Sequence, residues 1–234
     1  MEDYKKRYLE WLESDVVDED TKAELRAIED DEDEIEFRFG SYMEFGTGGL
    51  RSKMGAGTGM MNNYTVAQAT EGLARMIDNL GEEAKTRGVV IGYDSRHHSD
   101  DFARRSAEVL TAHGIRVYLF DKLRPTPCLS FGVRHFGAIA GINITASHNP
   151  SQYNGYKLYW EDGAQVTAPK DKEIITEVKN VTEYHTVKTM DKEAARARAL
   201  ELSLAFLSQI PEVRAIAQTD VEQPLFIHAG TEIL

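Results

Sequence analysis

The chain is poor in cysteine, in long apolar runs and in positive charge. Its 234 residues contain one cysteine, Cys128, so no disulfide can form within the chain. No segment is apolar over the length of a transmembrane helix, and the charged N-terminus lacks the apolar core of a signal peptide. The 27 basic residues face 39 acidic ones, and the net charge of −12 argues against binding to nucleic acid or to an anionic membrane. These features are typical of a protein of the reducing cytoplasm.

Several common catalytic signatures are also missing. Residues 55–59 are rich in glycine but lack the Gly-x-Gly-x-x-Gly spacing, and no Gly-Lys-Ser/Thr follows any glycine run. His97 and His98 have no His-Glu-x-x-His spacing around them, so we expect them to face solvent. The acidic residues 29–36 are predicted to be a solvated helix end or loop rather than a metal site. Dinucleotide, P-loop and zinc chemistry are therefore disfavoured.

Helical and strand patterns alternate in the middle of the chain. Apolar residues at helical spacing predict three helices, which cover residues 65–80 with Thr65 as cap, residues 99–114, and residues 127–137. Apolar runs predict strands over residues 89–93, 115–120 and 138–144. Helices of this length between strands imply parallel pairing, and residues 155–160 with 164–167 read as a hairpin. The predicted fold is α/β, a three-layer α/β/α mixed sheet that is mainly parallel, with an antiparallel edge hairpin.

The flanking segments suggest how the chain is divided. Residues 1–40 are predicted to be an N-terminal helical segment with a capping box at Thr21 and Glu24, and the glycine-rich residues 40–59 are predicted to be mostly loop. We expect a first domain over residues 41–190, which includes a helix at residues 170–180. Residues 191–234 are predicted to be a linker with a helix at 191–209 and the incomplete start of a second similar domain, beginning with a strand at 221–227.

A polar loop after the third predicted strand carries the most chemical information. Residues 145–150, Thr-Ala-Ser-His-Asn-Pro, lead into residues 153–157, Tyr-Asn-Gly-Tyr-Lys. In open α/β sheets, ligands bind at the carboxyl ends of strands. Ser147 is therefore placed to act as a nucleophile, although the loop lacks the Gly-x-Ser-x-Gly of a hydrolase elbow. The alternative is a turn serine that only satisfies nearby N–H groups.

These residues resemble the phosphoserine loop of the α-D-phosphohexomutases, the phosphoglucomutase and phosphomannomutase superfamily. Further matches occur upstream in the same order, at residues 45–51 (Phe-Gly-Thr-Gly-Gly-Leu-Arg), 92–96 (Gly-Tyr-Asp-Ser-Arg) and 124–127 (Arg-Pro-Thr-Pro). The sequence between these motifs is similar to that of the branch of phosphoglucomutases and phosphopentomutases. The resemblance covers about residues 4–180, and it makes residues 41–190 the phosphoserine domain of such an enzyme.

The resemblance implies roles for the three catalytic candidates. Ser147 would carry a phosphoryl group, give it to a sugar monophosphate and regain the other phosphate from the resulting bisphosphate. Lys157 would act as acid or base, which requires a lowered pKa, or would stay charged and clamp phosphate. His148 would hydrogen-bond phosphate, shuttle a proton or only shape the loop. The implied cofactors are Mg²⁺, bound through the phosphate on Ser147, and a sugar bisphosphate activator.

The resemblance also implies a set of phosphate-binding residues. Arg51 has the planar fork that suits phosphate oxygens, and Gly48 and Gly49 allow a close backbone approach. Asn149 belongs to the same set because it lies in the phosphoserine loop. For Asp94 and Arg96 we predict a supporting ion pair that organises loops, rather than a part in the reaction.

The predicted function is a phosphosugar mutase that interconverts glucose 1-phosphate and glucose 6-phosphate. An alternative is phosphopentomutase activity on ribose or deoxyribose phosphates. A third reading, a non-catalytic binding module, arises because the sequence lacks the Asp-Gly-Asp-x-Asp-Arg metal loop, the sugar-specificity loop and the distal phosphate domain of the family. The expected partner is a phosphorylated sugar, the 234-residue chain alone is expected to be inactive, and its oligomeric state stays open.

Overall fold

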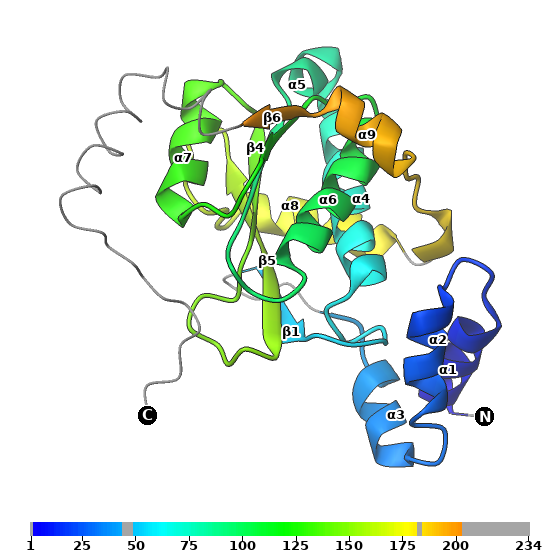
Figure 1. Cartoon of the computed structure of the whole chain (residues 1–234). Coiled ribbons are helices and arrows are strands. Elements are labelled where there is room, and N and C mark those ends of the chain that lie inside the picture. The colour runs from blue at the N-terminus through cyan, green and yellow to red at the C-terminus, as the bar shows by residue number, and fades with distance from the viewer. Residues whose placement is uncertain (1, 44–48, 182–183, 203–234) are drawn as a thin grey trace, which may run out of the picture.

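The computed structural model describes residues 2–43, 49–181 and 184–202, which form a central sheet between two layers of helices (Figure 1). The sheet has six strands in the order β1-β5-β4-β2-β3-β6. The strands are β1 Leu50–Lys53, β2 Val89–Tyr93, β3 Val117–Phe120, β4 Ala140–Ile144, β5 Tyr153–Trp160 and β6 Leu200–Leu202. The predicted three-layer α/β/α fold is confirmed.

The sheet is mixed, with a parallel centre. Strand β2 pairs in parallel with β3 and with β4, and Ile91 lies opposite Leu119 on one side and Ile142 on the other. Strand β5 runs antiparallel to β4. The carboxyl ends of β2, β3 and β4 therefore meet at one edge of the sheet, where open α/β folds bind ligands.

The antiparallel edge differs from the predicted hairpin. The strand beside β5 is β1, which lies inside the segment predicted to be mostly loop. Leu50 is buried in the core opposite Tyr156, and this tertiary packing outweighs the local preference of the glycine-rich segment for a loop. Residues 164–166 do fold back on β5 as predicted, through the antiparallel bridge between Tyr159 and Gln165 and through backbone hydrogen bonds from Val166 to Leu158 at 2.8 Å and from Trp160 to Ala164 at 3.0 Å, but they do not form a full strand.

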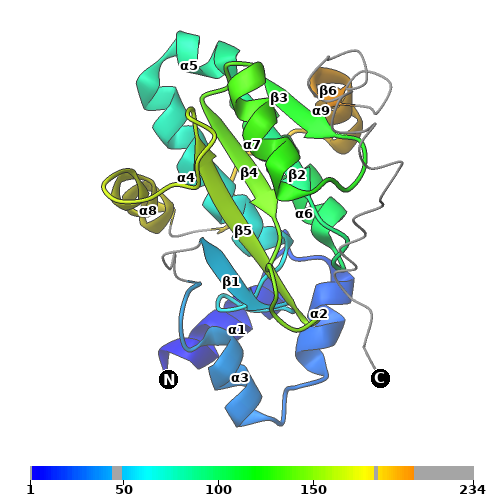
Figure 2. The ribbon, with the colours of Figure 1, turned by 90° about the vertical axis from the view of Figure 1, so that its left-hand side faces the viewer.

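Helices cover both faces of the sheet (Figure 2). The helices are α1 Asp3–Glu13, α2 Glu19–Arg26, α3 Glu32–Phe39, α4 Asn63–Leu80, α5 Glu82–Arg87, α6 Ser99–Ala112, α7 Thr126–His135, α8 Lys170–Asn180 and α9 Lys192–Arg198. Val89 and Ile91 of β2 face the core beneath α4 and α6, whereas Val90 faces the core beneath α7. Successive side chains of a strand point to opposite faces, so this fully buried strand supplies both cores. Among the described residues, no helix combines the length and apolarity that a membrane crossing needs.

Two predicted helix starts require correction. Helix α4 is capped by Asn62, and Thr65 is its third residue, whose hydroxyl accepts a hydrogen bond from the Asn62 N–H. Helix α2 is capped by the carboxylate of Asp18, which accepts from the backbone of Thr21, so the predicted Thr21 and Glu24 box does not form. In both places a nearby Asn or Asp side chain reaches the free N–H groups first.

The end of the linker helix is also corrected. Helix α9 ends at Arg198 rather than at residue 209, because Ala199 is extended and Leu200–Leu202 pairs with β3. Residues 203–209 and the predicted strand at 221–227 lie outside the described residues. The predicted helix at residues 170–180, in contrast, is confirmed as α8.

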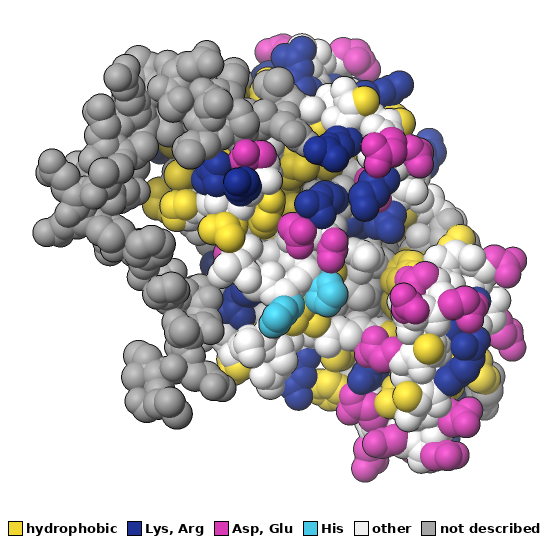
Figure 3. Space-filling view, viewed as in Figure 1, with side chains coloured by type: hydrophobic (Ala, Val, Ile, Leu, Met, Phe, Trp, Pro, Cys, Tyr) yellow, Lys and Arg dark blue, Asp and Glu magenta, His cyan; other side chains and the backbone are white. Residues whose placement is uncertain are grey.

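The N-terminal helices have a core of their own and carry a largely acidic surface (Figure 3). Trp11 packs edge-on against Phe39 and against Tyr64 of α4, which fastens this helical segment to the rest of the chain. Arg38 of α3 pairs with Glu24 and also lies against the turn that follows β1. The helices therefore support the strand that bears Arg51.

A buried charged network joins α4 to the end of α6. His113 contacts Glu71 through Nε2 at 2.9 Å and Asp78 through Nδ1 at 2.7 Å. The hydrogen bond to Glu71, opposed by burial and supported by Asp78, raises the pKa of His113 above its ordinary value of 6.5. Because the folded state holds this proton more tightly than the unfolded chain, the network stabilises the fold fully below pH 6.5. That stability is lost as the pH rises through the raised pKa.

We predict that the free energy of unfolding falls by roughly 1.5 to 3 kcal/mol, the scale of hydrogen bonds to charged groups, as the pH rises from 6 through the raised pKa of His113. Urea unfolding of the wild type and of His113→Asn measures the effect, and the variant should show a flatter pH dependence. The control is His135→Asn, which alters an exposed histidine of α7 and should keep the wild-type slope. An unchanged slope in His113→Asn would contradict the assignment.

Candidate active site

The site lies at the point where the order of the strands reverses. The chain passes from β2 through α6 to β3 on one side, then through α7 to β4 on the other side of β2. The loops after β2 and β4 therefore leave the sheet beside each other and diverge. The Asp94 N–H donates to the Ile144 carbonyl at 3.1 Å, which joins the two loops at their origins. Such a switch point is the usual ligand crevice of an open α/β sheet.

The loop after β4 presents Ser147 to solvent. Thr145 and Ala146 are buried, whereas Ser147 and His148 are exposed. The Thr145 hydroxyl accepts a hydrogen bond from the Ser147 N–H at 3.0 Å, and Ser147 adopts a left-handed backbone with φ 59°. The Ser147 Oγ lies 3.4 Å from the His148 Nδ1. A non-glycine residue with this φ is uncommon and is found often at functional sites.

Arg51 and Lys157 project from one face of the sheet near this edge. Arg51 lies opposite Gly155 on β5, and Lys157 lies two residues further along, opposite Asn143 on β4. Burial lowers the pKa of the Lys157 amine from its ordinary value of 10.5; the charge of Arg51 lowers it further, and Asp94 opposes both. Within the described part of the chain, neither cation has a hydrogen bond or an ion pair. The pair is therefore available to an anionic ligand.

The other residues predicted to bind phosphate are Gly48, Gly49 and Asn149. Gly49 has φ 97°, and a Cβ there would lie 2.3 Å from the Tyr156 carbonyl oxygen, so only glycine fits against β5. Asn149 is partly exposed, and its Oδ1 is buried without a hydrogen-bond partner among the described residues. Gly48 lies outside the described residues. Their predicted roles in phosphate binding stay predictions.

The predicted supporting pair forms. Arg96 Nε lies 3.4 Å from Asp94 Oδ2, so the predicted ion pair is confirmed. His97 and His98 are exposed, as the sequence predicts.

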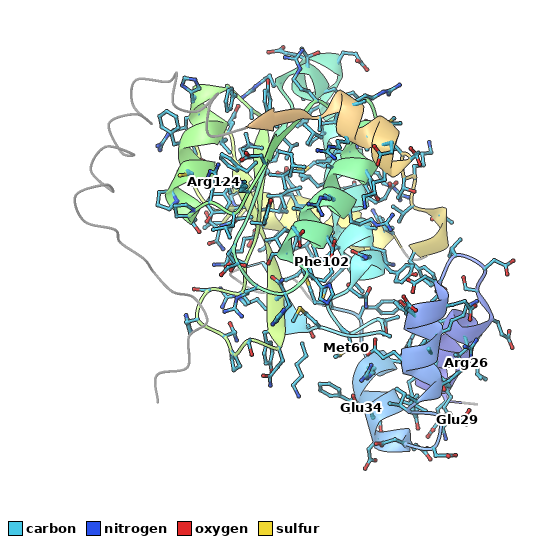
Figure 4. The ribbon with its side chains drawn as sticks, in the orientation of Figure 1. Arg26, Glu29, Glu34, Met60, Phe102 and Arg124 are labelled. Carbon is cyan, nitrogen blue, oxygen red and sulfur yellow. The ribbon has the colours of Figure 1, made fainter. Side chains whose placement is uncertain are left out.

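Figure 4 shows Arg124 near the start of α7, on the opposite side of the sheet from Phe102 of α6. Arg124 bonds within its own loop, to Asp121 and to the Leu123 carbonyl, both at 2.9 Å.

Sequence reasoning missed two buried amides beside the site. Asn143, opposite Lys157, donates to the Thr126 hydroxyl at 2.9 Å and ties β4 to the start of α7. Asn154 is fully buried next to Gly155 on β5. The available signal was a polar residue inside a segment that otherwise reads as a buried strand, because buried polar groups need partners.

Metal ligands are sparse in this part of the chain. No group of three or more His, Cys, Asp or Glu side chains in the described residues is arranged to hold a metal ion. The described side chains therefore do not form a Mg²⁺ site by themselves. A phosphate on Ser147 would add oxygen atoms of the kind that Mg²⁺ prefers.

The fold and the site define an α/β/α domain with an exposed serine at its switch point and two cations that have no ion pair within the described residues. The chain belongs to the phosphoglucomutase/phosphomannomutase family, because residues 42–185 match the family's alpha/beta/alpha domain I. The resemblance drawn from the sequence motifs is thereby confirmed.

The chain is similar to mutases from distant organisms. It is 44% identical to human phosphopentomutase over 172 residues, which are 70% of this chain and 28% of that protein. It is 41% identical to the phosphoglucomutase of Staphylococcus epidermidis over 166 residues, which are 71% of this chain and 29% of that protein. The crystal structure of a putative phosphomannomutase from Thermus thermophilus matches with a TM-score of 0.56 and 30% identity, over 69% of this chain and 34% of that one. The chain spans less than a third of the length of these two curated relatives.

The backbone of Ser147 generates a stability prediction. At its left-handed φ, a Cβ is unfavourable by roughly 1 to 2 kcal/mol. The free energy of unfolding of Ser147→Gly should therefore exceed that of Ser147→Ala by about 1 kcal/mol. Urea unfolding measures the difference. The same two changes at Ser130, inside helix α7, give the opposite order because glycine is about 1 kcal/mol worse than alanine in a helix. If the alanine variant were more stable than the glycine variant at both Ser147 and Ser130, the left-handed backbone of Ser147 would be contradicted.

The environment of Lys157 generates a second prediction. Removing the neighbouring charge with Arg51→Gln should raise the pKa of Lys157, because one of the two causes that lower it is gone. NMR titration of the lysine Cε resonances measures this pKa. Lys53→Gln is the control, since Lys53 lies on the same strand but rests over the Phe37 ring. An unchanged pKa of Lys157 in Arg51→Gln would show that the two side chains are not neighbours.

Proposed function

We propose that this chain carries the phosphoserine part of a phosphosugar mutase, with Ser147 as the residue that is phosphorylated. The supporting observation is the exposed, left-handed Ser147 at the switch point of a domain that belongs to the mutase family. Among the described residues Arg51 and Lys157 form no hydrogen bond or ion pair, although the charge of Asp94 acts on Lys157, and the two cations give the same edge a preference for anions. The human phosphopentomutase and the Staphylococcus epidermidis phosphoglucomutase are mutases by name, so the comparisons lend no support to a non-catalytic binding module.

The proposed reaction proceeds through a sugar bisphosphate. A hydroxyl oxygen of the sugar monophosphate forms a bond to the phosphorus on Ser147, and the bond from that phosphorus to Ser147 Oγ breaks. The sugar hydroxyl loses its proton, and Ser147 Oγ regains one. The other phosphate of the bisphosphate then returns to Ser147, which leaves the isomeric monophosphate. Phosphoryl transfer depends chiefly on positioning and on stabilisation of charge, and Arg51 is proposed to provide the charge stabilisation.

Lys157 is proposed to accept and return the sugar proton. Its partial burial favours the neutral amine that a base requires, and this supports the proposal over a permanently charged clamp. His148, 3.4 Å from Ser147 Oγ, is proposed to hydrogen-bond the phosphate. Gly48, Gly49 and Asn149 complete the proposed phosphate contacts. Mg²⁺ and a sugar bisphosphate activator belong to the proposal, with the Ser147 phosphate as the ligand that this part of the chain offers the metal.

The proposed substrate pair is glucose 1-phosphate and glucose 6-phosphate. Ribose or deoxyribose phosphates are the second candidate. The 44% identity to human phosphopentomutase supports this candidate. On this proposal the 234-residue chain alone folds but gives no sustained turnover, because the described side chains leave Mg²⁺ without a protein ligand set.

A hybrid enzyme tests the proposed role of Ser147. The matched region of this chain replaces the equivalent 172 residues of human phosphopentomutase, and a cooperative thermal transition verifies that the hybrid folds. We expect mutase turnover that falls at least about a thousandfold in Ser147→Ala, since loss of a nucleophile removes the main route. Ser151→Ala, at an exposed serine of the same loop, should leave turnover unchanged.

Turnover retained by the Ser147→Ala hybrid would overturn the proposal. Assays with glucose 1-phosphate and with ribose 1-phosphate, run on the same preparation, decide between the two substrate classes. A higher kcat/KM for ribose 1-phosphate would replace the hexose assignment by the pentose one.

A further inference from the structure

Arg96 makes an unusual set of contacts with the loop that carries Ser147. Its side chain comes from the loop after β2 and is only 9% exposed. The guanidinium donates to four backbone carbonyls of the chain that follows β4. The acceptors are Ser147 at 2.9 Å, Asn149 at 2.7 Å, Pro150 at 3.0 Å and Tyr153 at 3.1 Å. One side chain thus binds both ends of the loop.

We propose that Arg96 is a positioning residue, which holds Ser147 in the conformation needed for phosphoryl transfer. This inference rests on the proposed function. The left-handed backbone of Ser147 is unfavourable for a residue with a Cβ, so it persists only where neighbouring contacts fix it. Thr145 holds the N–H of Ser147, and Arg96 holds its carbonyl. With both peptide groups fixed, the direction of the Ser147 Cα–Cβ bond is set.

A buried chain of hydrogen bonds fixes Arg96 in turn. Asp94 accepts from the Arg96 N–H at 3.0 Å and from the Ser99 hydroxyl at 2.9 Å. The Ser99 hydroxyl accepts from the Asn154 Nδ2 at 2.9 Å, and the side-chain Oδ1 of Asn154 accepts from the Gly155 N–H at 2.8 Å. Ser99 and Asn154 are completely buried. The network therefore connects the Ser147 loop to β5, the strand that carries Lys157.

The geometry explains why an arginine serves here. A guanidinium presents five N–H donors in a planar fork, whereas an ammonium presents three at a single point. Lysine would keep the charge at this position but could not bridge four carbonyls that are spread over the loop. Arg124 provides a matched comparison at the same edge of the sheet, because its guanidinium, as far as the described residues go, bonds to Asp121 and Leu123 of its own loop and not to the Ser147 loop.

Amide hydrogen exchange of the 234-residue chain tests the contact directly. In Arg96→Lys we expect the hydrogen-bonded amides of Ser147, Asn149 and Tyr153 to exchange at least about tenfold faster, because local opening becomes easier. Arg124→Lys should leave them at the wild-type rate. In Arg96→Ala, guanidinium ion at low millimolar concentration should restore slow exchange by occupying the vacated site, and sodium ion should not.

Kinetics of the hybrid enzyme then tests positioning for the reaction. Arg96→Lys should lower kcat at least about tenfold and change KM less than twofold, because misplacement of the nucleophile affects the transition state more than binding. Amide exchange at the wild-type rate in the loop of Arg96→Lys would overturn the inference. Faster exchange throughout β2 and β4 would also overturn it, because that result indicates general destabilisation. Ser147→Ala with full turnover, alongside a loosened loop in Arg96→Lys, would instead overturn the proposed function.

Discussion

Parallel pairing of β2 with β4 is the constraint on which the site depends. It places the ends of the two strands side by side, with Tyr93 opposite Ile144, and it forces their loops to diverge at one edge of the sheet. The buried apolar side chains of β2 face both cores, so this pairing is among the most deeply protected features of the molecule. Ser147 and Arg96 follow directly from these strand ends, and their meeting is a consequence of the pairing.

The electrostatics of the site differ from those of the whole chain. The net charge of −12 would repel a phosphorylated sugar at long range, and much of the acidity lies on the N-terminal helices. Antiparallel pairing of β1 and β5 overcomes this locally by placing Arg51 and Lys157 on one face, where neither forms an ion pair among the described residues. The same proximity helps to lower the pKa of Lys157. A few local cations can thus create an anion site in an acidic protein.

The sequence predicts the centre of this fold better than its edges. The strand at residues 89–93 and the helices starting at Ser99 and Lys170 have strong apolar periodicity and clear ends, and they form as predicted. Strands β1 and β6 depend on partners that lie far away in sequence, so local patterns did not indicate them. Ser147 and Arg51 could be singled out by motif, but the contacts of Arg96 join residues more than fifty positions apart and required the structure.

The most direct measurement is to locate the phosphate itself. The hybrid enzyme, quenched in acid during reaction with glucose 1,6-bisphosphate and Mg²⁺, is digested, and the peptide that spans residues 145–153 is sequenced by mass spectrometry. We predict one phosphate on Ser147. When the bisphosphate carries an isotopic label in its phosphates, that label should leave Ser147 for the sugar phosphates after excess unlabelled glucose 1-phosphate is added before the quench. A phosphate on Thr145 or Ser151, or a Ser147 that stays unmodified while the enzyme turns over, would contradict it.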